Sequence, residues 1–279
     1  MKPASFTPYN FNDPELVSGI DDLNLWAAPF GLQLLETVQY KKNTRVLDIG
    51  CGMGFPLIEL AMRLGPSCTA YGIDPWPAGL HRAQQKTSVA GVNHITWVEG
   101  VAEALPFEDA YFNLLVSNNG MNNVQHLPAA FSECYRVAQP GAQFVFTMNT
   151  EDTFIEFYTL YRTALARHRL ERYEQNIAEH IYARRKPLPE IDELLLATGF
   201  QKRNMQQGAF TYRFASGAAL FQHFASRYAF LEAWLNIIPE EHREPVFDTL
   251  EQLINREVTE KGCFTITVPF VTIDCIKPG

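Results

Sequence analysis

The sequence predicts an α/β fold in which a doubly wound, mostly parallel sheet is extended by added helices. Between residues 45 and 149, apolar runs of strand length alternate with segments of helical periodicity. The apolar runs are nearly continuous, which is typical of parallel strands covered on both faces. The first run ends in a glycine-rich loop, and ligands of such sheets bind beyond the carboxyl ends of the strands.

Each element follows from a local signal. A polar and aromatic arm at 1–13 precedes one or two amphipathic helices, and Asp13-Pro14 is a favourable helix start. In the alternating region, strands are predicted at 46–49, 68–73, 95–98, 112–117 and 144–148, and helices at 57–64, 78–90 and 127–138. The Pro140-Gly141 pair separates the last of these helices from the fifth strand.

The second half of the chain is mainly helical. Residues 151–186 are helical and rich in aromatic side chains, which indicates an insertion after the fifth strand. Further elements are predicted as a helix at 191–197, a strand near 210–214, helices at 217–236 and 240–258, and a last strand at 263–276. We therefore divide the chain into an arm with helices (1–42), a core (43–150), a helical insertion or lid (151–189) and a closing part (190–279).

The composition excludes several classes of protein. Of the 279 residues, 47% are hydrophobic and 19% are charged, as in ordinary globular domains. The net charge of −8 makes nucleic acid a poor default partner. No apolar run is long enough for a membrane span, and no secretory signal is visible. Five widely spaced cysteines without a CxxC pair fit a reducing cytoplasm, and we expect no metal site.

One segment departs from the acidic character of the chain. Residues 162–186 hold seven Lys or Arg against three Glu. This excess predicts either a solvated helix face or a surface that attracts an acidic substrate or an anionic surface.

The strongest motif is the run VLDIGCGMG from Val46 to Gly54, in which a strand leads through three glycines into a helix. Dinucleotide enzymes use the spacing G-x-G-x-x-G, and here Phe55 stands at the third glycine position. Asp74 ends the second strand, where an acid accepts hydrogen bonds from both hydroxyls of a ribose. In this order the glycine loop and the acid indicate a ligand that contains a nucleoside.

The segments VLDIGCGMGFP, YGIDPW, EGVAEALPFEDAYFNLLVSNNGMNNV and ECYRVAQPGAQFVFTMN resemble successive motifs of class I S-adenosylmethionine-dependent methyltransferases. The similarity is greatest to the small-molecule group that includes the ubiquinone and menaquinone methyltransferases. It covers residues 45–149, and the final FTITVPFVTIDCIKPG is similar to the last strand of that family. The resemblance implies a Rossmann-like sheet of seven strands with the last one antiparallel. It also implies S-adenosylmethionine as cofactor and S-adenosylhomocysteine as product.

The resemblance implies cofactor contacts for Asp48, Gly50, Cys51, Gly52, Asp74, Pro75, Val101, Ala102 and Asn118. Asp48 would hold the loop and the ammonium group of the cofactor, and Asp74 would bind its ribose. Asn118 would contact the methionyl end through its carbonyl. Val101 is a departure, because family members often carry an acid at this position that bonds the adenine amino group; Glu103 is the candidate replacement.

The acceptor side is less specific. The stretch SNNGMNN at 117–123 predicts an acceptor held by hydrogen bonds, or only turn and helix-cap chemistry. His126 is a candidate general base, or a surface residue at a helix start. Other candidates for acceptor contact are Tyr9, Trp26, Asn119, Asn122, Asn123, Phe154 and Tyr158. The aromatic members of this set would equally serve as core residues.

We therefore predict a cytoplasmic enzyme that transfers a methyl group from S-adenosylmethionine to a small molecule, without a membrane span. Three alternatives stay open at this point. The chain could bind the cofactor without methylating, as a sensor or scaffold, or it could methylate a protein. A nucleotide-dependent oxidoreductase is the third, and Phe55 argues against it. A homodimer is compatible with the sequence.

Overall fold

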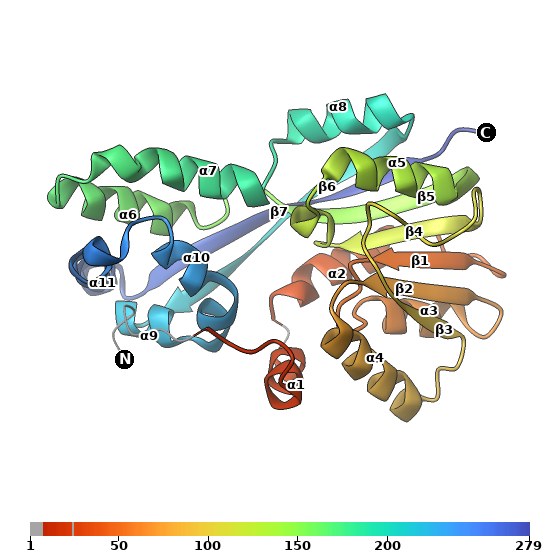
Figure 1. Ribbon diagram of the computed structural model, residues 1–279, viewed down its shortest axis with the longest axis horizontal. Helices are drawn as coiled ribbons and strands as arrows, with labels where there is room; N and C mark the ends of the chain where they lie inside the picture. Colours follow the sequence, from red (N-terminus) through yellow and green to blue (C-terminus); the bar gives the residue numbers. More distant parts are fainter. Residues whose placement is uncertain (1–7, 24) are drawn as a thin grey trace. The chain divides into compact units, whose positions relative to one another are not determined.

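The computed structural model describes residues 8–23 and 25–279 (Figure 1). The first seven residues of the predicted arm lie outside the described residues. The strands are β1 (Arg45–Ile49), β2 (Thr69–Asp74), β3 (Ile95–Glu99), β4 (Phe112–Asn118), β5 (Ala138–Asn149), β6 (Gln201–Phe214) and β7 (Phe264–Ile276). The helices are α1 (Pro14–Asp22), α2 (Ala27–Thr37), α3 (Leu57–Leu64), α4 (Pro77–Ala90), α5 (Leu127–Val137), α6 (Ile155–Arg167), α7 (Glu174–Arg184), α8 (Leu188–Thr198), α9 (Gly217–Gln222), α10 (Glu232–Leu235) and α11 (Glu240–Lys261). Three short elements are the 3₁₀ turns η2 (Met121–Asn123) and η3 (Glu171–Tyr173) and the π-helical η4 (Ser226–Leu231).

The strands pair into one sheet, which within the described residues has seven strands in the order β3-β2-β1-β4-β5-β7-β6. The pairs β1–β2, β1–β4, β2–β3 and β4–β5 are parallel, whereas β7 runs antiparallel to β5. The predicted doubly wound sheet with an antiparallel last strand is confirmed. Strand order reverses between β1 and β4, so the carboxyl ends of these two strands flank the switch point where ligands bind in such sheets.

The chain forms two compact units. The sheet unit comprises residues 11–149, 186–208 and 270–279. The helical unit comprises residues 150–185 and 209–269 together with the described residues of the first ten. The strands β6 and β7 contribute residues to both units. The functional roles assigned above to the four sequence segments stay predictions.

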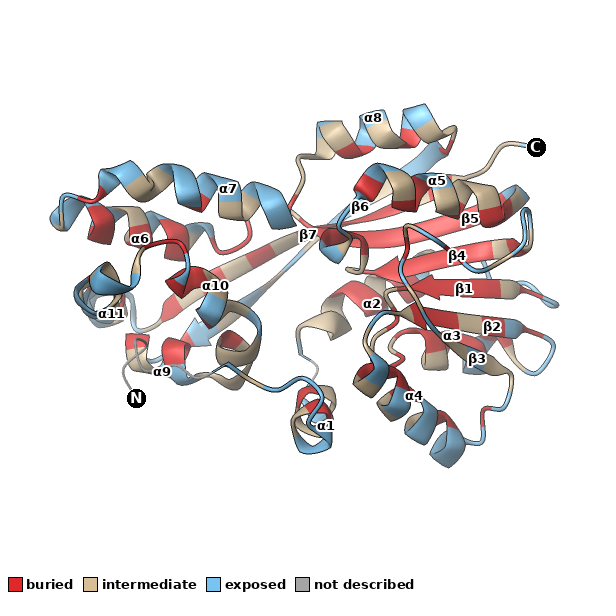
Figure 2. Ribbon diagram, viewed as in Figure 1, coloured by how far each residue is buried: buried red, intermediate tan, exposed pale blue. Residues whose placement is uncertain are grey.

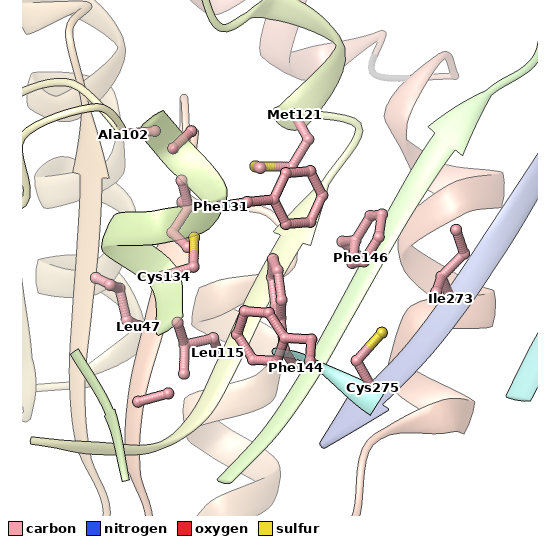
Figure 3. Close-up of a cluster of buried hydrophobic side chains, with 14 of the residues drawn as sticks. Leu47, Ala102, Leu115, Met121, Phe131, Cys134, Phe144, Phe146, Ile273 and Cys275 are labelled. Atoms are coloured by element: carbon pink, nitrogen blue, oxygen red, sulfur yellow. The ribbon is translucent and has the colours of Figure 1, made fainter. Parts of the chain in front are cut away.

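The core of the sheet unit has one apolar layer on each face of the sheet. Alternate side chains of a strand point to opposite faces, so Leu47 and Ile49 join the layer under α5 and α8. Val46 joins the opposite layer, which contains the apolar faces of α2 and α3. Figure 3 shows the first layer, where Phe131 of α5 lies over Phe144 and Phe146 of β5.

Local signals place the start of α1 and the end of α4 as predicted, whereas the predicted break at Pro140-Gly141 is wrong, because both residues lie within β5, which begins directly after α5. Asp13 caps α1, accepting a hydrogen bond from the backbone N–H of Glu15 at 2.9 Å, and Pro14 is the first helical residue. Gly91 ends α4 in the left-handed region at φ 66°.

The prediction of one continuous helix at 217–236 is wrong. His223 adopts an extended conformation (φ −59°, ψ 134°) and ends α9, and a π-helical turn and α10 follow. The ring of His223 packs against Tyr212 and Phe214 of β6, at 5.8 and 5.5 Å between ring centroids, and this long-range contact holds the break. The strand expected near 210–214 begins earlier, at Gln201.

Two further findings concern the described residues only. Within 8–23 and 25–279, no helix combines the length and apolar character needed to cross a bilayer. In the same ranges, no three His, Cys, Asp or Glu side chains are grouped so as to hold a metal ion.

Candidate cofactor and acceptor site

A cavity of about 610 Å³ lies at the carboxyl ends of the parallel strands in the sheet unit. Its wall is formed by the ends of β1 and β2 and by the loops that follow β1 to β4. Five of the residues predicted to bind the cofactor line it: Gly50, Asp74, Pro75, Val101 and Ala102. The volume is in the range of sites for small molecules and cofactors.

Asp74 joins the glycine loop to the start of α4. Its carboxylate accepts a hydrogen bond from the backbone N–H of Gly52 at 2.8 Å through Oδ2, and from that of Trp76 at 2.9 Å through Oδ1. Burial raises its pKa, and these two hydrogen bonds oppose the rise. A carboxylate has about four acceptor positions, so two remain for the hydroxyls of a ribose.

The glycine loop is shaped by close backbone packing. Gly50 has φ 74°, and a Cβ there would lie 3.0 Å from the Cα of Gly120. Gly120 is itself confined, because a Cβ on it would lie 2.5 Å from the carbonyl oxygen of Ile49. Gly52 has φ 49°, and a Cβ added there would have no atom within 4 Å. The loop therefore packs against the end of β4 at Gly50 and leaves open space at Gly52, where a ligand can approach the backbone.

Asp48 of β1 has a fully buried side chain whose two oxygens have no hydrogen-bond partner among the residues described. Burial, and to a smaller extent the negative charge of Asp74, raises its pKa to about 8, and the backbone N–H of Leu57 opposes the rise. An unpartnered buried carboxyl group favours a cationic partner nearby. A cofactor with an ammonium group supplies such a partner.

The side chain of Cys51 is buried, and its thiol is not suited to react with a ligand. The residue is 2% exposed, and a Cβ on Gly72 would lie 2.8 Å from its sulfur. Burial raises the pKa of the thiol, and the neighbouring Asp48 and Asp74 add to this. The thiol stays protonated near pH 7, so only the backbone of Cys51 is suited to cofactor contact.

The asparagine cluster ties β4 to β5. Asn118 donates to the carbonyl of Ala27 at 3.1 Å and accepts from the hydroxyl of Thr147 at 3.1 Å. These bonds occupy its side chain, and the contact implied for it uses its backbone carbonyl. Asn119, at φ 59°, accepts from the backbone N–H of Asn149 at 3.2 Å.

Two asparagines complete the cluster. Asn122 is buried and donates to the carbonyl of Asn149 at 3.2 Å. Asn123 donates to the carbonyl of Asn119 at 3.3 Å and lines the cavity. Three of the four asparagines thus hold the strand ends together, and Asn123 is the one placed at the cavity wall.

His126 lines the cavity and is also the N-cap of α5. Its Nδ1 accepts the backbone N–H of Ala129 at 3.2 Å, which places the proton of the neutral ring on Nε2. In this tautomer Nε2 donates a hydrogen bond and cannot accept a proton. Glu103, also at the cavity wall, accepts the backbone N–H groups of Gln125 and His126 at 2.8 and 3.0 Å. Both proposed roles, base and adenine partner, stay predictions.

The arm contacts the loop that follows β2, next to the cavity. The indole Nε1 of Trp76 donates to the carbonyl of Phe11 at 2.9 Å, and the two rings meet edge to face with centroids 6.3 Å apart. Pro75, the neighbour of Trp76, lines the cavity. Trp26 packs on Phe30 of α2, at 5.6 Å between centroids.

The remaining acceptor candidates belong to the helical unit. Tyr9 packs edge to face on Phe224, at 6.2 Å. Phe154 and Tyr158 are buried in the interior of this unit, at 1% and 0% exposure. Packing accounts for both rings, and acceptor contact stays a prediction.

The cavity includes residues that sequence analysis did not select, among them Gly100, Gly120 and Val124. The sequence could have indicated Gly120, because a glycine shortly after a buried strand and among asparagines allows close approach of the backbone. The other two follow strands or turns without a distinctive chemistry, and only the fold brings them to the wall.

Comparisons with known proteins agree with this geometry. The sequence profile of the family described as "Methyltransferase domain" matches residues 47–146. The demethylmenaquinone methyltransferase of Anoxybacillus flavithermus is 35% identical over 127 residues, which are 46% of this chain and 54% of the relative. That of Staphylococcus aureus is 32% identical over 132 residues, with the same shares of 46% and 54%. The chain spans about half the length of these relatives.

Solved structures share the fold. The YcgJ protein of Bacillus subtilis has a TM-score of 0.58 at 18% identity, covering 90% of this chain and 99% of that one. A SAM-dependent methyltransferase from Aquifex aeolicus has a TM-score of 0.51 at 17% identity, covering 69% and 91%. The matched segment, 47–146, holds the glycine loop, Asp74 and the strands that form the cavity. The chain thus carries a segment that matches the methyltransferase-domain family, on a fold that these solved structures share.

Proposed function

We propose that this protein transfers a methyl group from S-adenosylmethionine to a small-molecule acceptor. The observation that carries the proposal is Asp74. It closes β2 at the cavity wall, bonds the glycine loop, and keeps acceptor capacity for a ribose. This residue lies within the segment that the methyltransferase family matches.

The residues present fit this cofactor. Asp48 offers a buried carboxyl group for the ammonium, and Gly52 leaves its backbone open on the ligand side. Pro75, Val101 and Ala102 form an apolar part of the wall, suited to a purine ring. S-adenosylmethionine supplies an electrophilic methyl group on a sulfonium centre.

The chain itself contributes binding and orientation. Methyl transfer is an in-line displacement, so holding acceptor and cofactor in line accounts for much of the rate. His126 Nε2–H and the Asn123 amide are the polar groups at the wall next to the end of β4. Both are neutral donors when His126 is unprotonated, and they would orient an oxygen of the acceptor by hydrogen bonds. We propose demethylmenaquinone, supplied in its reduced quinol form, as the first acceptor to test, since the relatives are named for methylating that compound.

Cofactor binding is tested by thermal unfolding with S-adenosylmethionine, S-adenosylhomocysteine and NAD(P). A ligand that binds only the folded chain stabilises it by about 2.7 kcal/mol at about 100 times its Kd. We expect both adenosyl ligands to raise Tm and NAD(P) to leave it unchanged. The Asp74→Ala variant should lose this response, whereas Glu108→Gln, at an exposed position of the same unit, should keep it. A wild-type Tm that neither adenosyl ligand raises would contradict the proposal.

Turnover distinguishes the alternatives. Release of S-adenosylhomocysteine in the presence of a quinol, and not in its absence, supports a small-molecule methyltransferase. Tight cofactor binding without turnover on any acceptor would instead favour a sensor or scaffold. The cytoplasmic location, the homodimer, the absence of nucleic-acid partners and the lid role of residues 151–189 remain part of the proposal and are not needed for this test.

A further inference from the structure

The interior of the helical unit holds hydrogen-bond donors that have no acceptor. Arg185 is 5% exposed, and its Nε and Nη1 have no hydrogen-bond partner among the residues described. In the same part of the structure, the hydroxyl of Tyr158 and the Nε1 of Trp234 are buried and equally without a partner. Buried polar groups are nearly always hydrogen-bonded, so this group of donors requires an explanation.

Arg185 and Trp234 lie against the ring of Phe154, and Arg185 also lies against the ring of Tyr158. The guanidinium carbon of Arg185 lies 5.7 Å from the ring centroid of Phe154 and 6.0 Å from that of Tyr158. The ring of Trp234 lies 5.9 Å from that of Phe154. Figure 2 shows buried residues along α6, which carries Tyr158, and at α10, which carries Trp234.

The position of Phe154 is fixed by the backbone. It has φ 64°, an unusual value for a bulky residue, and its N–H donates to the carbonyl of Thr267 at 2.8 Å. The carboxylate of Glu156, the acid in the first turn of α6, accepts hydrogen bonds from the N–H and the hydroxyl of Thr267. This acid is therefore used to anchor the helix and forms no ion pair with Arg185.

Aromatic faces alone do not compensate a buried guanidinium. Cation–π contact recovers part of the lost hydration, but a buried charge without a counter-ion stays unfavourable. An apolar side chain of similar length would pack there at lower free energy. A set of donors without acceptors, with one positive charge among them, is complementary to an anion. We propose that Arg185, Tyr158 and Trp234 form a binding site for the carboxylate group of a ligand.

The charge of the site selects a carboxylate over a phosphate. Arg185 presents a planar fork that binds both oxygens of a carboxylate. His180, whose ring lies 6.0 Å from that of Tyr158, does not add a second charge. Burial, and to a smaller extent the positive charges of Arg185 and Arg184, lowers its pKa to about 4, so the ring is neutral at pH 7. One buried cation matches one negative charge, whereas a phosphate dianion would keep a second charge uncompensated.

This inference goes beyond the proposed methyl transfer and does not depend on it. All three donors belong to the helical unit, whereas the residues of the cofactor cavity belong to the sheet unit. Either proposal can therefore fail without the other, because binding of S-adenosylhomocysteine tests the cofactor cavity and binding of a carboxylate tests the site at Arg185.

The test uses the full chain and four probes at constant ionic strength: acetate and benzoate, each against its neutral amide, acetamide and benzamide. We expect at least one carboxylate to raise the wild-type Tm in a saturable manner and its amide to have no effect. Arg185→Met should abolish this response and should itself raise the Tm without ligand, because it removes an unpaired buried charge. Arg184→Met, at an exposed neighbouring position, should behave as the wild type. All three proteins should keep their response to S-adenosylhomocysteine.

A second variant and a second readout keep the test decisive. Tyr158→Phe removes one donor and should weaken carboxylate binding several-fold while the chain stays folded. In NMR titrations, the pKa of His180 should rise when the carboxylate binds, because the charge of Arg185 is then neutralised. A Tm lowered by Arg185→Met would show that the residue serves packing alone and would overturn the proposal. So would a wild-type response that is equal for the carboxylate and its amide, or absent for both carboxylates.

Discussion

Replacing Asp48 by Asn should change how the stability of the sheet unit depends on pH. The side chain is fully buried, and its pKa in the folded chain is about 8, against 3.8 for an ordinary Asp. Between these values the folded chain holds a proton that the unfolded chain has released. Raising the pH therefore favours unfolding of the wild type. Asn has the shape of the protonated acid and does not titrate, so the variant lacks this contribution.

The size of the change in unfolding free energy follows from the pH range between the two pKa values. Each pH unit between the two pKa values costs the wild type about 1.4 kcal/mol of unfolding free energy, which is about 3 kcal/mol between pH 5 and pH 7. The stability of Asp48→Asn relative to wild type should rise by this amount over that range. The difference should level off above about pH 8, where Asp48 is ionised in both states.

Hydrogen exchange of buried amides in β1 and β4 is the suitable assay, because it reports on the sheet unit separately from the helical unit. The exchange rates are corrected for their intrinsic pH dependence and compared between wild type, Asp48→Asn and the exposed control Glu108→Gln. Parallel curves for wild type and Asp48→Asn would refute the reasoning, since they would mean that Asp48 titrates alike in the folded and unfolded chain.

Three other predictions concern the loop, the cap and the cysteines. Gly50→Ala should lower the Tm more than Gly91→Ala: both sites have positive φ, which costs about 1 to 2 kcal/mol, but only at position 50 would the new Cβ lie 3.0 Å from the Cα of Gly120. Thermal unfolding of the two variants checks this, and equal losses would contradict it. His126→Ala should lower the free energy of unfolding by about 1 kcal/mol, because it removes the cap of α5, and His126→Asn should keep the wild-type stability because Asn is a good cap. If His126→Asn also keeps the wild-type kcat, the imidazole does not act as a base. Iodoacetamide should add one label to the native chain, at Cys263, because the other four cysteines are buried; intact mass and peptide mapping measure this, and fast labelling elsewhere would contradict it.

The sequence determined the sheet and the meeting of the glycine loop with Asp74 in the candidate site, because both depend on short-range signals. Apolar runs, glycines and capping residues fix which segments become strands and helices, and the order of those segments fixes the topology. Once β1 and β2 lie side by side, their ends meet at one edge, so the glycine loop and Asp74 come together without further information.

The tertiary structure decided what each polar side chain is free to do. The Asn118 amide bonds Ala27 and Thr147, partners far away in sequence, and no local pattern predicts that its side chain is occupied. The Glu103 carboxylate is occupied in the same way, by the backbone N–H groups of Gln125 and His126 from another loop. Asp48 and Arg185 carry ordinary charged side chains in the sequence. Both are buried, and neither the Asp48 oxygens nor Nε and Nη1 of Arg185 have a hydrogen-bond partner in the part of the chain that the structure describes. Burial and hydrogen-bond partners arise from packing between distant segments, whereas periodicity and turn chemistry act within a few residues, and this difference in range separates what the sequence alone determined from what the fold added.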